Sequence, residues 1–301
     1  MNHFTSNILM ISPEKFRSNE FTMDDNVFQS RKLVNTEVSK KVMKEFEKLE
    51  NTISNKGITV YSMKDDSIHD TPDGVFPNNW ISFHNKHKAV IYPMLAENRR
   101  LERHSDTLKK LSKKGIDVQI THDYSIYENQ NKFLEGTGSI VLDRNSKIAY
   151  CSISMRSNEE LFNKFCDDLN YRPIIFNSIY ESKPIYHTNV LMSICNNFCV
   201  ICLESIINED EKNNLIKSFE YSGLEIIDIT YNQMSSYLGN CIQLLDKDGN
   251  PILVMSTTAF KSISNQQLKR ILNHTDIIHS DIKTIENYGG GSARCMIAEI
   301  F

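Results

Sequence analysis

The sequence predicts an α/β fold in which a unit of strand, turn, strand, helix and strand occurs five times around a ring. This is a five-bladed α/β propeller with pseudo-fivefold symmetry. Three observations predict it: amphipathic helical segments recur at intervals of roughly 55 residues, paired apolar runs precede four of them, and each end of the chain carries part of the remaining unit. The alternative is an open α/β sheet with repeated hairpins. We expect a single domain over residues 1–301.

Five segments have apolar residues at helical spacing, and we expect helices at about 36–55, at 97–114, from Ser157, at 209–221 and from Ser264. Two of them open with a capping-box pair, in which Ser157 is followed by Glu160 and Ser264 by Gln267. Glycine is a frequent residue at helix ends, and it follows three of the segments, as Gly57, Gly115 and Gly223.

A short run rich in β-branched residues follows each helix, at 58–63, 116–120, 173–179, 224–229 and 276–282. Before the second to fifth helices, two strand-like runs flank the polar turns HNKH, DRNS, CNNF and DKDGN, which are typical of hairpins. The fifth unit is split between the termini. Its strands are expected in CMIAEIF at the C-terminus and NILMIS near the N-terminus, a division that closes a ring of units.

The composition narrows the class of protein. The formal net charge of −4 argues against binding nucleic acid by general phosphate neutralisation. No segment approaches the roughly 20 apolar residues that span a bilayer, and the N-terminus lacks the pattern of a signal peptide. Seven cysteines, an odd number, favour free thiols in a reducing compartment. We therefore expect a soluble, cytoplasmic protein that binds neither nucleic acid nor membranes.

Polar residues stand at the same phase of each repeat, just before the first strand of each hairpin. They are Asn79, Glu135, His187, Asn240 and Cys295, separated by 56, 52, 53 and 55 residues. In a ring of equivalent units, equivalent positions point towards the axis. A thiol, an imidazole and a carboxylate would then meet in one cleft, and these are the groups that nucleophilic catalysis with acid–base assistance requires.

The motifs around these residues resemble those of the guanidino-group-modifying penteins, which include arginine deiminases, dimethylarginine dimethylaminohydrolases and amidinotransferases. The resemblance rests on four segments in the expected order over nearly the whole chain. These are Asp73-Gly-Val-Phe-Pro-Asn-Asn79, Phe133-Leu-Glu135-Gly136, His187-Thr188-Asn189 and Gly289-Gly-Gly-Ser-Ala-Arg-Cys295-Met. The branch that this sequence resembles most is that of the arginine-deiminase-related hydrolases linked to citrulline use.

The resemblance implies a five-module fold and a hydrolase of a small guanidino or ureido compound. Cys295 would be the nucleophile, His187 the acid and then the base, and Glu135 the carboxylate that orients His187. Asp73 and Asn79 would bind substrate. Such a mechanism needs no metal and no organic cofactor. Because amidinotransferase-type members often dimerise, a homodimer is a further expectation.

Two positions depart from the family pattern. Deiminases and dimethylarginine hydrolases usually have aspartate where this chain has Asn79, and deiminases have His-x-Asp where it has His187-Thr188-Asn189. An amide both donates and accepts hydrogen bonds, so it suits a neutral ureido group or an arginine derivative held mainly by Glu135 and Asp73. With a neutral substrate another cation would have to help form the thiolate. Arg294 is the candidate, and it could equally bind a substrate carboxylate.

Two other functions stay open at this point. An amidinotransferase would pass the amidino group to an amine instead of water, and a non-catalytic protein such as a ribosome-binding factor shares the general architecture. Two further features are interpreted as structural. Cys195, Cys199 and Cys202 are expected to be buried thiols, and the basic stretch Arg99–Lys114 is expected to be a solvated helix face.

Overall fold

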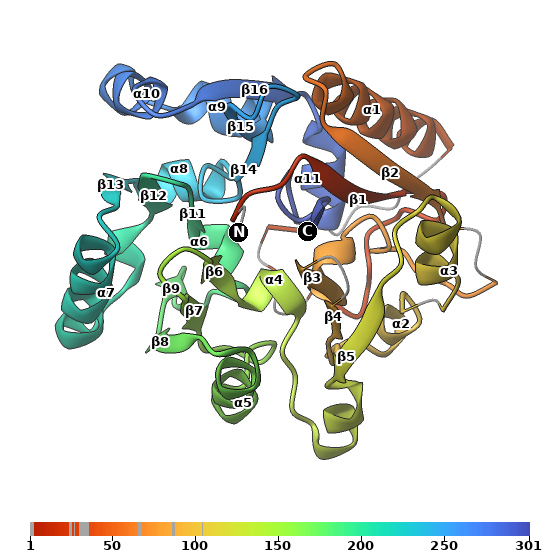
Figure 1. Cartoon of the computed structure of the whole chain (residues 1–301), viewed down its shortest axis with the longest axis horizontal. Coiled ribbons are helices and arrows are strands. Elements are labelled where there is room, and N and C mark those ends of the chain that lie inside the picture. The colour runs from red at the N-terminus through yellow and green to blue at the C-terminus, as the bar shows by residue number, and fades with distance from the viewer. Residues whose placement is uncertain are drawn as a thin grey trace.

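The structure is a computed structural model, and it describes residues 3–23, 26, 28–29, 36–65, 68–85, 88–103 and 105–301. Within these residues the strands form five three-stranded sheets and one two-stranded pair, β9 (Ile179–Tyr180) with β10 (Lys183–Pro184). Figure 1 shows the five sheets arranged around a common centre with helices towards the outside. Each sheet contains one antiparallel and one parallel pairing, as the predicted unit requires.

The split unit is confirmed. The strand β17 (Ala298–Ile300) pairs antiparallel with β1 (Asn7–Ser12), and β1 pairs parallel with β2 (Thr59–Lys64). The helix α1 (Thr36–Ser54) lies between β1 and β2 in the sequence. Its buried face is formed by residues at helical spacing, namely Val42, Glu45, Phe46, Leu49 and Ile53.

The other four sheets follow in chain order. They are β3 (Ile81–Asn85), β4 (Lys88–Ile91) and β5 (Gln119–Asp123); β6 (Val141–Asp143), β7 (Ile148–Ser152) and β8 (Arg172–Phe176); β11 (Met192–Ile194), β12 (Phe198–Ile201) and β13 (Glu225–Asp228); and β14 (Ile242–Leu245), β15 (Pro251–Ser256) and β16 (Asp276–Ser280). The middle strands β7 and β12 are buried throughout, which explains why their sequences are continuous apolar runs. Residues 86–87 of the predicted HNKH turn lie outside the described residues.

The predicted helices mostly have the expected bounds, as α7 (Glu209–Tyr221) and α10 (Asn265–Leu272) show. The capping box of Ser264 with Gln267 is present. The one predicted at Ser157 is wrong. The helix α5 (Glu159–Leu169) is capped by Asn158, whose side chain accepts a hydrogen bond from the Leu161 amide. Ser157 instead forms β-bridges with Leu134 and Ser154.

The predicted helix over 97–114 is two helices, α2 (Glu97–Arg100) and α3 (Ser105–Lys113). The chain turns after Arg100, and Arg99 Nε lies 2.8 Å from Glu102 Oε1. Leu101, at the turn, is exposed. The helical pattern of the sequence is thus interrupted between the two helices.

Shorter helical turns link the sheets. They are the 3₁₀ turns Pro77–Asn79, Ser125–Gln130 and Leu203–Ser205, and the helices α4 (Gly136–Ser139), α6 (Thr188–Leu191), α8 (Tyr231–Ser235), α9 (Thr257–Ser262) and α11 (Lys283–Gly289). The 3₁₀ turn at Pro77–Asn79, α4 and α6 precede β3, β6 and β11, so they occupy similar places in three units.

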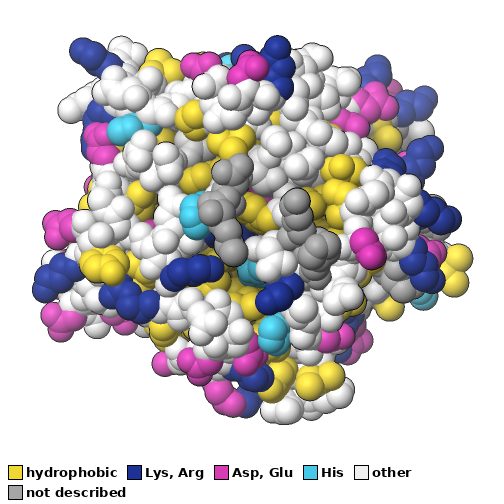
Figure 2. Space-filling model, in the orientation of Figure 1, with side chains coloured by type: hydrophobic (Ala, Val, Ile, Leu, Met, Phe, Trp, Pro, Cys, Tyr) yellow, Lys and Arg dark blue, Asp and Glu magenta, His cyan; other side chains and the backbone are white. Residues whose placement is uncertain are grey.

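Charges of both signs are mixed around the face drawn in Figure 2, without one large patch of either sign. Of the helices in the described part of the chain, none combines the length and apolar character needed to cross a membrane. All seven cysteines, Cys195, Cys199 and Cys202 among them, are buried free thiols.

Two neighbouring units make a backbone contact at Gly136. Its φ is +48°, and a Cβ atom at this position would lie 2.2 Å from the carbonyl oxygen of Asn78. A side chain there would therefore be strained and would also collide with backbone, which cannot move aside cheaply.

This contact predicts the effect of adding one methyl group. We expect Gly136→Ala to lower the free energy of unfolding by clearly more than the ~1–2 kcal/mol of left-handed strain alone. The matched control is Gly115→Ala, because Gly115 has φ +86° and a Cβ atom added there would have nothing within 4 Å. Urea denaturation of both variants checks this, and equal losses would contradict the close contact.

Candidate active site

A buried histidine and a buried glutamate form the centre of the candidate site. Glu135 directly precedes α4, and His187 directly precedes α6. These equivalent places in two units bring the side chains together, with 2.8 Å between His187 Nε2 and Glu135 Oε2. The two residues are 2% and 0% exposed, so water does not screen the pair.

The electrostatics of this pair favour a neutral imidazole beside a carboxylate. Burial by itself would raise the pKa of Glu135, but Arg156, the hydrogen bond with His187 and Arg99 together hold that pKa well below its ordinary value. Burial lowers the pKa of His187, against the opposing influence of Glu135. Since an ionised carboxylate only accepts, Nε2 of His187 carries the proton and Nδ1 is the basic nitrogen. Gly138 packs closely against the imidazole, since a Cβ atom there would lie 2.8 Å from Nδ1.

Two arginines surround Glu135. The Nη1 atoms of Arg99 and Arg156 lie 3.7 and 3.5 Å from Glu135 Oε2. Arg99 also donates two hydrogen bonds to Glu102, at 2.8 and 3.0 Å, and its Nε lies 3.7 Å from Asp73 Oδ2. Two guanidinium groups thus lie among three buried carboxyl groups.

Neither arginine is among the site residues that the sequence predicts. The expectation that Arg99 lies on a solvated helix face is wrong, because Arg99 is 2% exposed and points into the protein. The available signal was Glu102, an acidic residue three positions further along. Arg156 lies in the turn between β7 and α5, where no pattern marks it, and its guanidinium lies 4.9 Å from the centre of the Tyr186 ring.

Cys295 lies in the turn between α11 and β17. Its Sγ is 3.5 Å from Asn189 Nδ2 and 3.2 Å from Asn240 Nδ2. The glycine run before it is packed closely. A Cβ at Gly289 or Gly291 would come within 2.9 Å of the Phe76 ring, and the Gly290 carbonyl accepts a hydrogen bond from the Tyr186 hydroxyl. The Gly290 N–H is bonded to the Glu286 carbonyl.

One cavity unites most of the predicted site. Cys295, His187, Asp73 and Asn79 all line it, together with Arg99 and Arg156. Two buried atoms of these residues, Asp73 Oδ1 and Asn79 Nδ2, have no hydrogen-bond partner among the described residues. The Asn79 amide is oriented by Arg99, whose Nη1 donates to Oδ1 at 3.0 Å. Burial raises the pKa of Asp73, and Arg99 and Asn19 limit the rise.

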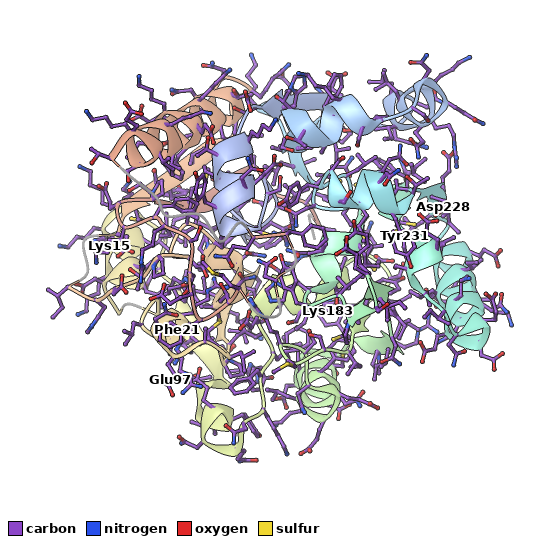
Figure 3. All side chains as sticks on the ribbon, turned by 180° about the vertical axis from the view of Figure 1, so that it is seen from behind. Lys15, Phe21, Glu97, Lys183, Asp228 and Tyr231 are labelled. Atoms are coloured by element: carbon purple, nitrogen blue, oxygen red, sulfur yellow. The ribbon has the colours of Figure 1, made fainter. Side chains whose placement is uncertain are left out.

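The loop after β1 forms one wall of this cavity through Thr22 and Asn26. The same loop carries Lys15 and Phe21, which can be found in Figure 3, the view from behind. Glu97, labelled there too, opens α2, the helix that carries Arg99. The wall around the arginines is therefore built from segments far apart in the sequence.

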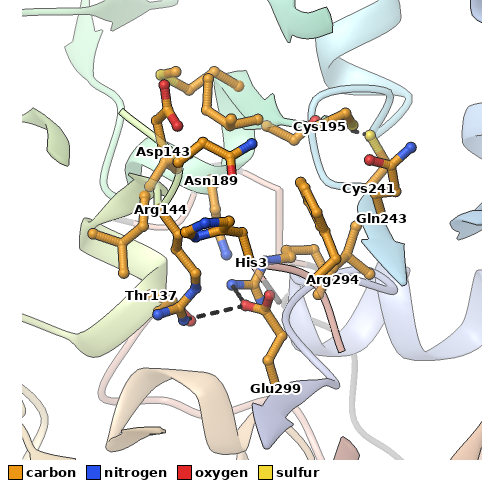
Figure 4. A pocket seen from close by; sticks show the side chains of 18 residues that line it. His3, Thr137, Asp143, Arg144, Asn189, Cys195, Cys241, Gln243, Arg294 and Glu299 are labelled. Carbon is orange, nitrogen blue, oxygen red and sulfur yellow. Dashed lines mark hydrogen bonds and ion pairs between the residues drawn. The ribbon is translucent and has the colours of Figure 1, made fainter. Parts of the chain in front are cut away.

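The structure does not bring Arg294 to this cavity. Arg294 lines a second cavity, drawn in Figure 4, where its Nη2 lies 3.1 Å from Glu299 Oε2. Burial lowers the pKa of Arg294, and Glu299 and Cys295 partly offset this. A role for Arg294 at Cys295 or in binding substrate therefore stays a prediction. Asn189 also lines the second cavity, but its amide reaches Cys295 Sγ and so lies between the two.

Within the described part of the chain, no group of three or more His, Cys, Asp and Glu side chains has an arrangement that could hold a metal ion. The groups able to do chemistry are thus a thiol, a neutral imidazole with a bound carboxylate, and charged or amide groups that can orient a polar molecule. This set fits nucleophilic attack by sulfur with proton transfer by the histidine.

Residues 12–301 match the family model described as N,N dimethylarginine dimethylhydrolase, eukaryotic. A comparison with curated protein sequences found no match.

Solved structures with similar folds include the N-terminal domain of ArgZ, an arginine dihydrolase from the ornithine-ammonia cycle in Cyanobacteria. A mutant of it bound to substrate aligns with TM-score 0.75 at 15% identity, over 98% of this chain and 97% of that one. The same domain covalently bound to a reaction intermediate gives TM-score 0.76 at 14% identity, with the same coverage. A DDAH mutant from Pseudomonas aeruginosa, complexed with citrulline, gives TM-score 0.65 at 14% identity over 99% of each chain. At these identities the likeness establishes the fold.

The charge cluster predicts a large effect of Arg99. We expect Arg99→Met to lower the free energy of unfolding by about 3–5 kcal/mol, because it leaves buried carboxylates without their cation. The loss should be larger at pH 8 than at pH 5. Without the arginine, the carboxyl pKa values rise in the folded state, and this opposes folding increasingly as pH rises above the unfolded values.

Urea denaturation at both pH values measures this effect. The control is Arg100→Met, which removes a neighbouring, partly exposed arginine that donates mainly to the Met94 and Leu95 carbonyls. A loss for Arg99→Met no larger than that of the control, or one independent of pH, would refute the role assigned to Arg99.

Proposed function

The chain belongs to the eukaryotic N,N dimethylarginine dimethylhydrolase family, within the guanidino-group-modifying pentein superfamily, and on that premise we propose a reaction for it. It hydrolyses a carbon–nitrogen bond in the guanidino group of an arginine-related small molecule, through a covalent intermediate on Cys295. One observation carries this proposal: Cys295 and the buried His187, which is hydrogen-bonded to Glu135, line the same cavity.

The charges around the cavity favour a cationic head group. Three buried carboxyl groups, Asp73, Glu102 and Glu135, lie with two guanidinium groups, and His187 is neutral. Burial raises the pKa of Glu102 to about 7 and also raises the pKa of Asp73. The N–H groups of a guanidinium would satisfy Asp73 Oδ1. The positive charge would also keep Asp73 ionised despite the burial that raises its pKa.

In the first half-reaction the thiol proton passes to Nδ1 of His187, and Glu135 stabilises the imidazolium that results. The thiolate attacks the guanidino carbon, forming a C–S bond. The imidazolium then returns the proton to the leaving nitrogen. The C–N bond breaks, ammonia or an amine departs, and a thiouronium remains on Cys295.

In the second half-reaction His187 takes a proton from water, and the oxygen attacks the same carbon. The C–S bond breaks as the carbonyl of the ureido product forms, and the hydroxyl proton of the adduct passes to solvent, where the released ammonia or amine takes it up. Sulfur leaves as a thiolate that is reprotonated by His187. The enzyme is thus regenerated, and the net reaction is hydrolysis.

A neutral ureide is the second candidate substrate, and Asn79 supports it. Its Nδ2 is a buried donor with no acceptor among the described residues, and a ureido oxygen would supply one. The two candidates differ in which unpartnered atom the substrate satisfies, Asp73 Oδ1 or Asn79 Nδ2.

The proposal includes the arrangement of the fold: one domain over 1–301 in which the five units close into a propeller. Contacts between first strands of neighbouring units support it, since β17 lies against β3, β6 against β11, and β11 against β14. The fold likeness to the ArgZ domain over 98% of this chain agrees with it.

A substrate panel tests the reaction. We expect the wild type to release ammonia or an amine from arginine, a methylated arginine or agmatine, with citrulline tested beside them as the neutral ureide. Cys295→Ala should lose activity by about 10⁴-fold or more, because no other described thiol lines the cavity. Cys241→Ala is the matched control, since Cys241 is equally buried and lines the second cavity. Full activity in Cys295→Ala would refute the proposal.

Labelling of Cys295 distinguishes a protein without activity from an enzyme whose substrate is missing from the panel. A haloacetamidine carries the planar head of a guanidine on an alkylating carbon, and it should modify Cys295 in the wild type. If the panel is silent and Cys295 is unlabelled, the enzyme proposal fails and a binding function is favoured. If Cys295 is labelled, addition of amine acceptors distinguishes an amidinotransferase.

The acid limb of kcat/KM reports the ionisation of His187, which must be neutral in the free enzyme to accept the thiol proton. Because burial lowers the pKa of His187, we expect this limb below the ordinary histidine value of ~6.5. Glu135 raises the pKa of His187, so Glu135→Gln should shift the limb further towards acid and reduce kcat.

The control for this profile is Glu102→Gln. It replaces a carboxyl group of the same buried cluster, whose pKa burial raises to about 7, without touching His187. It should therefore move the limb less than Glu135→Gln does. A limb that lies above pH 6.5 in the wild type, or that moves towards alkaline pH in Glu135→Gln, would contradict the assigned pair.

A further inference from the structure

A thiolate on Cys295 needs a stabilising group. Arg294, the cation expected from the sequence, does not line the same cavity. Arg294 is turned to Glu299, and the proton on Nε2 of His187 is held by Glu135. Among the described residues, the polar atoms in contact with Cys295 Sγ belong to two amide side chains, those of Asn189 and Asn240. Asn240 is the nearer donor, at 3.2 Å against 3.5 Å.

The orientation of the Asn240 amide follows from its second partner. Asn240 Nδ2 lies 2.9 Å from the backbone carbonyl oxygen of Asn189, and a carbonyl oxygen can only accept. The nitrogen, not the oxygen, must therefore face that carbonyl. One N–H is used there, which leaves the second N–H of the same group for Cys295 Sγ.

The loop that carries Asn240 is held tightly. The Asn240 amide N–H donates to the Tyr237 carbonyl at 2.9 Å, and the Tyr237 hydroxyl donates to the Glu286 carbonyl of α11 at 3.1 Å. A Cβ atom at Gly239 would lie 2.5 Å from the Val190 carbonyl oxygen, so the loop presses directly on α6. The donor is thus fixed between the helix that carries Asn189 and the helix that leads to Cys295.

We propose that Asn240 is a further catalytic residue, whose side-chain amide donates a hydrogen bond to the Cys295 thiolate and so takes the place of a neighbouring cation. The inference rests on the proposed role of Cys295 as the nucleophile. A fixed amide donor favours the thiolate over the thiol without adding net charge next to the substrate. It acts twice in the reaction, when the thiolate attacks and when sulfur leaves the thiouronium.

A neutral donor also fits either substrate. A cation next to sulfur would repel a guanidinium head group in the same cavity, whereas an amide does not. Asn189 assists from a greater distance, and its carbonyl fixes Asn240.

The test compares Asn240→Ala with Asn240→Asp by the rate at which iodoacetamide alkylates Cys295 across pH 5–10, followed by mass spectrometry of the Cys295 peptide. We expect Asn240→Ala to slow alkylation at pH 7 about tenfold and to move the midpoint of the rate profile upward by about one pH unit. Asn240→Asp should move it further, because a carboxylate cannot donate and repels the thiolate.

Which of the two substitutions shifts the Cys295 profile more distinguishes an electrostatic role of Asn240 from a packing role. Asp has nearly the shape of Asn, so a merely structural role would make Asp the milder change and Ala the more severe one. Ser193→Ala is the matched control, since Ser193 makes the corresponding contact to Cys241, 3.0 Å from Oγ to Sγ, and not to Cys295. Its Cys295 profile should equal that of the wild type.

The test distinguishes failure of the proposed function from failure of the role proposed for Asn240. If wild-type Cys295 is inert to alkylation, and Cys295→Ala keeps full activity, the proposed function fails. If wild-type Cys295 reacts but its pH profile is the same in both Asn240 variants, or is shifted more by Ala than by Asp, the role of Asn240 is refuted while the proposed function stands.

Discussion

The ionised carboxylate of Glu135, with no exposed surface, is the constraint on which the rest of the site depends. A buried charge is tolerated only when partners compensate it. Here the partners come from three separate segments: His187 before α6, Arg99 in α2 and Arg156 after β7. Two local irregularities lie beside these residues. The helix that carries Arg99 ends at Arg100, and Gly136, which follows Glu135, lies close to the Asn78 carbonyl.

The same constraint sets the chemistry. Because Glu135 is already ionised, a proton accepted by His187 in the proposed reaction would create an ion pair with little reorganisation. Because burial keeps the resting imidazole neutral, the histidine is available as a base. The two arginines hold Glu135 ionised, but the neighbouring Asp73 and Glu102 prevent them from making the cavity cationic. A cation can therefore bind in the cavity while Glu135, the partner of His187, stays ionised.

The five sheets and the pairing of Glu135 with His187 could be predicted from the sequence, whereas the two arginines of the site could not. The repeat predicted the five sheets and the divided unit, because hydrophobic periodicity and turn chemistry are local properties. The phase of the repeat also predicted that Glu135 would meet His187, since equivalent positions in neighbouring units are adjacent whatever their identity. Arg99 and Arg156 could not be predicted in this way. Their side chains reach the site from positions off the phase, and their direction depends on tertiary partners. That Arg294 lines the second cavity could not be predicted either, because adjacency to Cys295 in sequence says nothing about the direction of a side chain in a turn.

The amides at Asn79, Asn189 and Asn240 gain a common explanation from this geometry. The neutrality of Asn79 and Asn189 suggested a neutral substrate when only the family pattern was considered. In the structure, two of them contact Cys295 Sγ, and the third accepts a hydrogen bond from Arg99. A carboxylate at 189 or 240 would lie within about 3.5 Å of a sulfur that must become an anion. Under the proposed function, amides there would serve the nucleophile whatever the charge of the substrate. Asp73, which has an unpartnered oxygen, lines the same cavity and would supply the charge that a guanidinium substrate requires.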